Sequence, residues 1–251
     1  MVSPARGVWA ITEKGRQRLK MVPKTPPTRI IDRASTLKQD ISKYVEDKGS
    51  LFNRHPDMSE ADTISTIIEP LLQILGWNPQ ALDEVQRQYP VQGRRGIEHV
   101  DIALKIDNDV KVLLEAKSVS TVLNESDERQ VLNYAYNQGA EWCILTNGRE
   151  LRVYDPFAGR DIEDRLLFSL LLEEFPNHPD EIALLSRENI NRGRIRDWGR
   201  ERQAMRAIIN WILQNEQEIM DAIRINVTAL ERTEIQEIVG KFLRQMKSIE
   251  L

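Results

Sequence analysis

The clearest pattern in the chain is an apolar residue at every third or fourth position between Ser59 and Leu75, which predicts an amphipathic helix. Ser59 is followed three residues later by Asp62, as in a capping box, and Gly76 is well suited to end the helix. The apolar stripe consists of Ile64, Ile67, Ile68, Leu71 and Leu75. We therefore expect one face of this helix to pack on the core.

Strand patterns follow this helix. Between residues 83 and 114 the period falls toward two, which predicts three strands. A helix is then predicted for residues 126–138, ended by Gly139, and two more strands for residues 142–146 and 151–154. Asn147-Gly148, between these two strands, is a strong hairpin signal. The order α-β-β-β-α-β-β predicts an α/β fold with a mixed sheet and helices on its faces.

The flanking segments have weaker patterns. Prolines mark a linker after residue 22, and a short polar helix is predicted for residues 35–46. Beyond Pro156 the sequence indicates mostly helix, with two amphipathic stripes. The stripes comprise Ala204, Ala207, Ile208, Trp211 and Ile212, and then Ile235, Ile238, Val239, Phe242, Leu243 and Met246.

Composition places the chain among ordinary globular proteins. Its 251 residues are enough for one main domain with accessory elements, and 41% are hydrophobic and 29% charged. The net charge of -4 neither supports nor excludes a nucleic-acid partner, because a basic groove can exist on an acidic protein. Cys143, the single cysteine, lies in an apolar run and is interpreted as a core residue. No apolar run is long enough to span a membrane, so we expect a cytoplasmic protein without a membrane partner.

The alternation in the second and third strands fixes a hairpin register when the turn is centred on Asn108. Asp101 then lies opposite Glu115, and Lys117 follows one pleat further along the same strand. His99 is interpreted as a polar strand residue rather than a ligand. The opposite, apolar face of the hairpin pairs Val100, Ile102, Leu104 and Ile106 with Ala116, Leu114, Val112 and Val110.

Two carboxylates at this spacing repel each other unless a cation joins them. Magnesium binds oxygen ligands from one or two carboxylates together with substrate phosphate and water. Lys117 would be placed to position or deprotonate an attacking water and to counter charge on the phosphate. The pattern therefore favours phosphodiester hydrolysis.

Asp101 followed by Glu115-Ala116-Lys117 resembles the D-(x)n-E-x-K signature of PD-(D/E)XK nucleases, although Val100 replaces the proline of the family name. Gln130-Val-Leu-Asn-Tyr134 is similar to the Q-x-x-x-Y motif of several branches. Residues 69–77, Glu-Pro-Leu-Leu-Gln-Ile-Leu-Gly-Trp, resemble the N-terminal nuclease domain of type I restriction enzyme R subunits and their stand-alone relatives. The resemblance spans roughly residues 57–155.

The resemblance implies a Mg²⁺ ion, for which Mn²⁺ could substitute, held by Asp101, Glu115 and the backbone carbonyl of Ala116. Lys117 would serve the attacking water. Gln130 would hold Lys117 or a phosphate. Tyr134, one turn later on the same helix face, would contact DNA.

Family members also use a glutamate from the first helix, and this chain has two candidates. Glu60 precedes Ile64 by four residues on the core-facing stripe, whereas Glu69 is predicted on the outer side. We therefore prefer Glu60. A charge placed at the N-terminus of a helix for its dipole would explain Glu60 equally well.

Basic residues offer further contacts. Arg94 and Arg95 precede the second strand and could touch DNA phosphates or simply be solvated charge. A dense basic run could contact a nucleic-acid backbone or form an exposed helix face. The run comprises Arg192, Arg194, Arg196, Arg200, Arg202 and Arg206. Residues 7–19 resemble the wing and closing helix of the winged-helix domain that precedes some Mrr-type restriction nucleases, without a recognition helix before them.

These observations predict a restriction-endonuclease-like core, αβββαβ, with a helical C-terminal extension. The expected divisions are a winged-helix-like remnant (1–22), a linker and short helix (23–56), the nuclease core (57–160) and a helical region (161–251). The expected function is metal-dependent DNA endonuclease activity in restriction or defence, with a homodimer or a restriction-complex subunit as partner. No phosphate-binding motor motif occurs, so any translocation requires a partner. The alternatives are a non-catalytic DNA-binding or assembly module and a helical oligomerisation protein.

Overall fold

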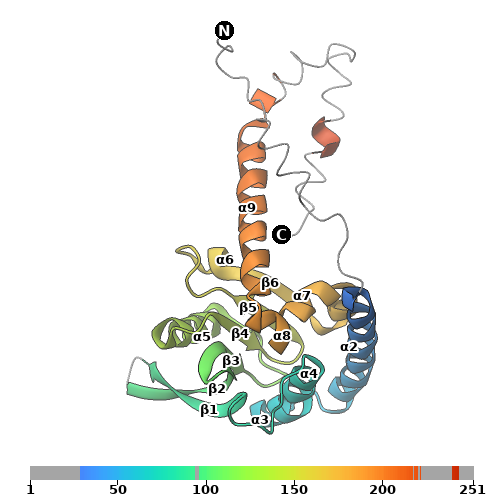
Figure 1. Cartoon of the computed structure of the whole chain (residues 1–251), viewed down its shortest axis with the longest axis vertical. Coiled ribbons are helices and arrows are strands. Elements are labelled where there is room, and N and C mark those ends of the chain that lie inside the picture. Colours follow the sequence, from blue (N-terminus) through green and yellow to red (C-terminus); the bar gives the residue numbers. More distant parts are fainter. Residues whose placement is uncertain (1–28, 94–95, 217, 220, 222–238, 243–251) are drawn as a thin grey trace.

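A computed structural model of the chain describes residues 29–93, 96–216, 218, 219, 221 and 239–242 (Figure 1). Its centre is a six-stranded mixed sheet in the order β1-β2-β3-β4-β5-β6, in which β3 and β4 are parallel and all other neighbours antiparallel. The strands are β1 (Val85–Gly93), β2 (Gly96–Ile106), β3 (Asp109–Ala116), β4 (Trp142–Thr146), β5 (Glu150–Tyr154) and β6 (Leu166–Leu171). The mixed sheet with helices on its faces confirms the α/β fold class that the sequence predicted.

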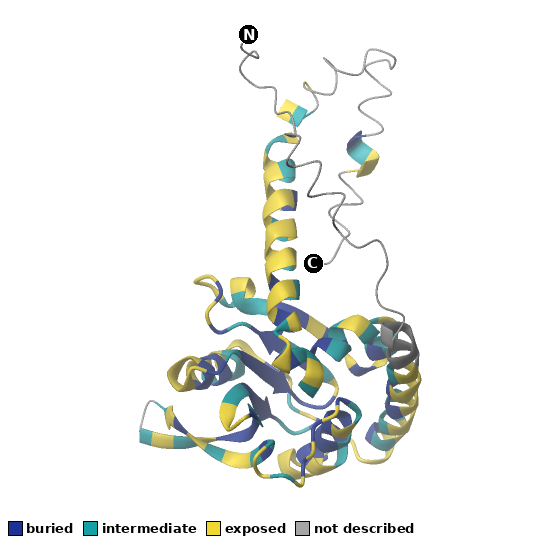
Figure 2. Cartoon of the chain, in the orientation of Figure 1, coloured by how far each residue is buried: buried dark blue, intermediate teal, exposed yellow. Residues whose placement is uncertain are grey.

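Helices cover both faces of the sheet. The central strand β4 is buried along its whole length, whereas the edge strand β1 is largely exposed (Figure 2). One face packs against α2 (Arg29–Arg54), the continuous segment α3 (Glu60–Thr63), η1 (Ile64–Ile68) and α4 (Glu69–Ile74), and the later elements η2 (Leu172–Asn177), α7 (Pro179–Leu184) and α8 (Arg187–Asn191). The other face packs against α5 (Glu125–Gln138). The short helix α6 (Ile162–Arg165) precedes β6, and α9 (Arg194–Gln214) projects away from the sheet (Figure 1).

The first predicted helix forms, but its middle turn is a π-helix. Ser59 caps α3 by accepting the N–H of Asp62, and Gly76, with φ of 83°, follows the end of α4 as expected. In η1 the N–H of Glu69 bonds the carbonyl of Ile64, five residues earlier. The next residue, Pro70, has no N–H and its ring displaces the carbonyl of the preceding turn, which explains why the helix widens here.

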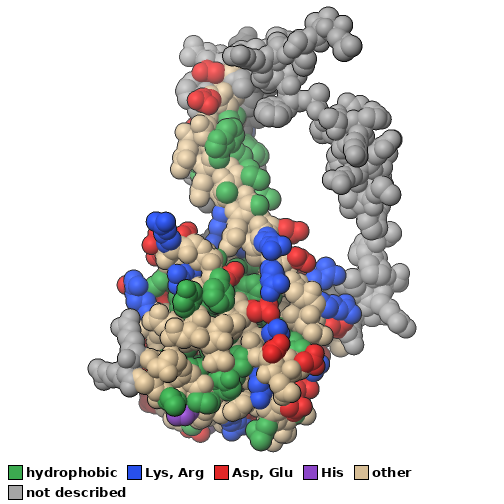
Figure 3. Space-filling model, turned by 60° about the vertical axis from the view of Figure 1, so that its left-hand side comes forward, with side chains coloured by type: hydrophobic (Ala, Val, Ile, Leu, Met, Phe, Trp, Pro, Cys, Tyr) green, Lys and Arg blue, Asp and Glu red, His purple; other side chains and the backbone are tan. Residues whose placement is uncertain are grey.

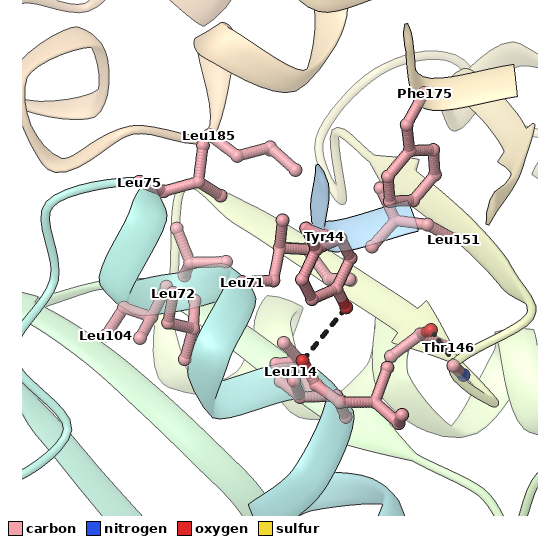
Figure 4. A pocket seen from close by; sticks show the side chains of 15 residues that line it. Tyr44, Leu71, Leu72, Leu75, Leu104, Leu114, Thr146, Leu151, Phe175 and Leu185 are labelled. Atoms are coloured by element: carbon pink, nitrogen blue, oxygen red, sulfur yellow. Dashed lines mark hydrogen bonds between the residues drawn. The ribbon is translucent and has the colours of Figure 1, made fainter. Parts of the chain in front are cut away.

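Tyr44 of α2 joins this π-turn inside an apolar pocket of the core (Figure 4). Its hydroxyl donates to the carbonyl of Ile67 at 2.9 Å, and burial raises the pKa of the phenol far above its ordinary value. The pocket is walled mainly by leucine and isoleucine side chains of the helix and the sheet. It is therefore part of the core packing rather than a polar binding site.

Tyr44→Phe is expected to lower the free energy of unfolding by about 1–3 kcal/mol, because the buried Ile67 carbonyl loses its donor. Urea denaturation measures the change. Tyr89→Phe is the matched control, since its hydroxyl accepts an exposed bond from Gln138 at 3.2 Å. Equal stability of the two variants would contradict this role of Tyr44.

The β2–β3 hairpin has the predicted register next to the carboxylates. Ile102 pairs with Leu114 and Leu104 with Val112. Nearer the turn the prediction is wrong, because a bulge at Lys111 shifts the pairing and Ile106 lies opposite Asp109. The turn is the residue pair Asp107-Asn108, both at positive φ, rather than a turn centred on Asn108. Val100 is also misassigned, since it packs in the cluster under α5.

Two flanking elements differ from the sequence prediction. The helix expected at residues 35–46 spans Arg29–Arg54, because Ile41, Tyr44 and Phe52 bury one face of it against the core. The region after residue 160, expected to be mostly helical, supplies the sixth strand, β6. Its run Leu-Leu-Phe-Ser-Leu-Leu has no period that distinguishes strand from helix.

The basic run, which begins directly after α8 and continues along α9, makes several contacts within the chain. Arg192 pairs with Glu188, Arg196 pairs with Glu141, and Arg202 lies over the ring of Trp198. Further along α9, apolar side chains are exposed on the projecting helix (Figure 3). They are Met205, Ile208 and Trp211.

Several sequence predictions lie outside the described residues. These are the winged-helix-like segment at residues 1–22, the arginines Arg94 and Arg95, and most of the second C-terminal stripe. Among the described residues, no helix combines the length and apolar character needed to cross a membrane.

Candidate active site

Asp101 of β2 and Glu115 of β3 lie side by side in the sheet, and each is only 5% exposed. One oxygen of Asp101 accepts the backbone N–H of Ala116 at 2.8 Å, and the other accepts the amide of Gln88 at 3.1 Å. Gln88 reaches this position from β1 with a φ of 48°, which is unusual for a residue other than glycine. These bonds fix the orientation of the Asp101 carboxylate.

Lys117 directly follows β3 and binds Glu115. Its Nζ lies 2.8 Å from Oε1 of Glu115, while its backbone N–H donates to the carbonyl of Thr146 at 2.8 Å. The second carboxylate oxygen of Glu115, Oε2, is buried and has no hydrogen-bond partner among the described residues. The structure thus brings together the three residues predicted as the catalytic centre.

The pKa values of Asp101, Glu115 and Lys117 are shifted by burial and by the charges of their neighbours. Burial raises the pKa of Glu115 to about 7, with the Asp101 charge adding to the rise and the Lys117 hydrogen bond opposing it. Burial also raises the pKa of Asp101, against the effects of the Ala116 N–H, Lys117 and Gln88. For Lys117, burial lowers the pKa, but its bond to Glu115 and the nearby carboxylates outweigh burial and raise it overall. Lys117 is therefore an ammonium donor at neutral pH.

Glu60 lies at the start of α3, close enough to share the electrostatics of this centre. Its pKa is raised by partial burial and then by the charge of Asp101, while Lys117 lowers it. Glu69 is elsewhere: it forms an ion pair with Arg87 and is 7% exposed, so its predicted outer position is wrong. The inserted π-turn between the two glutamates rotates one relative to the other, which a regular helical period does not predict.

Gln130 and Tyr134 of α5 bind each other rather than Lys117. The amide of Gln130 donates to the Tyr134 hydroxyl at 2.9 Å, and that hydroxyl donates to Glu98 of β2 at 2.6 Å. Tyr134 is only 5% exposed, and burial followed by the Glu98 bond raises the pKa of its hydroxyl to about 12. In this arrangement the pair joins α5 to β2, and Tyr134 presents little surface to DNA.

Two residues of this neighbourhood were not anticipated. Gln88 has no sequence signal, since nothing in a strand pattern indicates a positive φ there. Glu98 alternates with exposed residues like any polar strand position, and only the packing of α5 on the sheet places it next to Tyr134.

The donor set suits a hard divalent cation. Asp101 and Glu115 supply carboxylate oxygens, and the unpartnered Oε2 of Glu115 is a buried acceptor that a cation would satisfy. Within the described ranges, no cluster of three or more His, Cys, Asp or Glu side chains is arranged to hold a metal. Two carboxylates and the Ala116 carbonyl would therefore be completed by water and substrate, the pattern that magnesium favours.

Comparison with protein-family models matches residues 45–197 to the MmeI N-terminal domain, which is more than half of the chain. The chain belongs to the MmeI N-terminal domain family. This family is a restriction-enzyme family. The matched region of this MmeI N-terminal domain includes Glu60, Asp101, Glu115 and Lys117 and runs through β6 to the start of α9.

A solved structure described as a fragment of an HsdR subunit of a type I restriction enzyme from Vibrio vulnificus YJ016 is similar to part of the chain. The two are 24% identical with a TM-score of 0.36, and the match covers 51% of this chain and 26% of that one. The chain thus spans about a quarter of the length of that structure. No curated protein matches the chain.

Proposed function

We propose that the chain hydrolyses DNA phosphodiester bonds with Mg²⁺, which Mn²⁺ can replace. The metal would be held by Asp101, Glu115 and the carbonyl of Ala116. One observation carries this proposal: two adjacent carboxylates are almost fully buried, and one of them has a buried oxygen without a hydrogen-bond partner in the part of the chain that the structure describes. Such a pair is costly to ionise without a cation, and a catalytic metal site provides one.

Bound magnesium would polarise the phosphate and lower the pKa of a coordinated water. Lys117, protonated at neutral pH, would donate to the phosphate oxygens or to the attacking water and oppose the charge that develops in the transition state. Asp101 keeps one orientation because Ala116 and Gln88 donate to it. Glu60 would orient water on the open side of the pair.

Membership in a restriction-enzyme domain family supports DNA as the substrate and other subunits as partners. Because one such centre cuts one strand, cutting of both strands would require a second copy or a second binding event. We include a homodimer in the proposal for this reason. Gln130 and Tyr134 would act by fastening α5 beneath the centre rather than by touching the phosphate.

The direct test incubates purified protein with supercoiled and linear DNA in Mg²⁺, in Mn²⁺ and in chelator, beside the Asp101→Asn variant. Cleavage that requires the metal and is absent in the variant is the expected result. Cleavage that persists in Asp101→Asn would contradict the proposed centre. Salt-sensitive DNA binding without cleavage would instead favour a non-catalytic DNA-binding module.

A further inference from the structure

The turn between β4 and β5 contacts two segments that carry residues of the candidate site. Thr146, the last residue of β4, accepts the backbone N–H of Lys117 at 2.8 Å. Gly148 in the turn has a φ of 83° and lies against α3 and η1. A Cβ added to Gly148 would lie 3.2 Å from Thr63 and 3.3 Å from Ile67. The turn therefore touches both the strand end bearing Lys117 and the helix bearing Glu60.

Asn147 makes the third contact, to the loop that follows Lys117. Its side-chain nitrogen Nδ2 donates to the carbonyl of Thr121 at 2.8 Å, and the residue is only 6% exposed. Its Oδ1 accepts the N–H groups of Arg149 and Glu150, at 2.9 and 2.8 Å. Oδ1 of Asn147 thus stabilises the β4–β5 turn, and Nδ2 binds the loop that follows Lys117.

The loop at residues 118–123 is also attached to the segment that directly precedes α3. The N–H of Val119 donates to the carbonyl of Met58 at 3.2 Å, two residues before Glu60. Within the loop, the hydroxyls of Ser118 and Thr121 lie 2.7 Å apart. A displacement at Thr121 would therefore reach Lys117 along the chain and Glu60 through Val119.

We propose that Asn147 is a positioning residue whose Nδ2 holds the loop at residues 118–123 and thereby sets Lys117 and Glu60 relative to the carboxylate pair. The proposal rests on the function proposed above. In the described part of the chain, the side-chain hydrogen bonds of Asn147 go to its own turn and to Thr121, not to the proposed metal ligands. It acts through the loop, so its loss affects the chemical step more than DNA binding.

Asn147→Asp separates the two roles of the side chain. An aspartate keeps an oxygen for the turn but replaces the Nδ2 donor by a second acceptor facing the Thr121 carbonyl. We expect kcat for DNA cleavage to fall by about 10- to 100-fold, the size of loss that a misplacement of about 1 Å produces, with KM for DNA nearly unchanged. Backbone amides of residues 118–123 should exchange with solvent faster than in the wild type.

Asn147→Ser is the uncharged companion, because a serine hydroxyl can still accept in the turn but is too short to reach Thr121. It keeps the test valid if the buried charge of the aspartate unfolds the protein. Asn78→Asp is the control, since the Asn78 Oδ1 also accepts a turn N–H, from Gln80 at 3.1 Å, but at an exposed turn outside the site. This control should retain wild-type kcat and loop exchange.

Faster loop exchange together with a lower kcat in both Asn147 variants supports the proposal. Unchanged loop exchange, or faster exchange with unchanged kcat, overturns it. If the wild type itself does not cut DNA, the proposed function fails, and loop exchange in the variants still decides whether Asn147 holds the loop. The two failures are therefore distinguishable.

Discussion

Lys117→Ala is expected to lower the rate of Mg²⁺-dependent DNA cleavage by about 10²- to 10³-fold, the range observed when one charge-stabilising donor is removed from an active site. The reason is local: Lys117 is the ammonium group bonded to Glu115, at 2.8 Å, beside the carboxylate pair. Initial rates on supercoiled plasmid at saturating Mg²⁺ measure the effect. The fold should survive, because the backbone bond from residue 117 to Thr146 does not involve the side chain.

Lys111→Ala is the matched control for this variant. Lys111 lies on the same strand, β3, and also forms an ion pair, with Glu141 at 3.0 Å, but at the opposite end of the strand. A partly exposed pair of this kind contributes about 0–1 kcal/mol to stability and nothing to the proposed centre. Equal activity of Lys111→Ala and Lys117→Ala would contradict the role assigned to Lys117.

Magnesium binding is expected to weaken by about tenfold for each pH unit below 7, because the metal must displace the proton on Glu115. The pKa of this carboxyl in the metal-free protein is about 7, mainly through burial. Titration of Mg²⁺ by calorimetry should therefore give an affinity about 30-fold lower at pH 5.5 than at pH 8. Glu115→Gln should bind Mg²⁺ weakly at every pH.

Protonation of Glu115 also makes the folding stability depend on pH. The folded, metal-free protein holds a proton on Glu115 that the unfolded chain, with a pKa near 4.5, releases, so stability falls as pH rises from about 4.5 to about 7. Magnesium reverses that loss, and the rise in Tm on adding Mg²⁺ should grow over the same interval. The same Mg²⁺-induced rise in Tm at pH 5.5 and pH 8 would contradict a metal site at Glu115.

The sequence predicted that Asp101 and Glu115 are neighbours because strand alternation allows few registers for the hairpin. With one face of β2 and β3 apolar, Asp101 and Glu115 must share the other face, and the pairing of Ile102 with Leu114 agrees. The same reasoning failed at Lys111, where a bulge adds a residue without any compositional signal. Local alternation thus predicts a face correctly only between irregularities.

Contacts between residues far apart in the sequence could not be predicted from local patterns. Tyr134 was expected near DNA, but it bonds Glu98, 36 residues earlier, which only the packing of α5 on β2 brings close. Because of the π-turn before Pro70, Glu60 and Glu69 point in different directions than a regular helix would give. No helical period in the sequence predicts such a turn. The contact of Asn147 with Thr121 likewise depends on how the β4–β5 turn meets the loop after Lys117.

The measurement that tests the central claim most directly is anomalous scattering from crystals of the protein soaked in Mn²⁺. We predict one strong peak between the carboxylates of Asp101 and Glu115, adjacent to the carbonyl of Ala116, and its loss in crystals of Asp101→Asn. A peak elsewhere, or a peak at this position that persists in Asp101→Asn, would contradict the proposed metal centre.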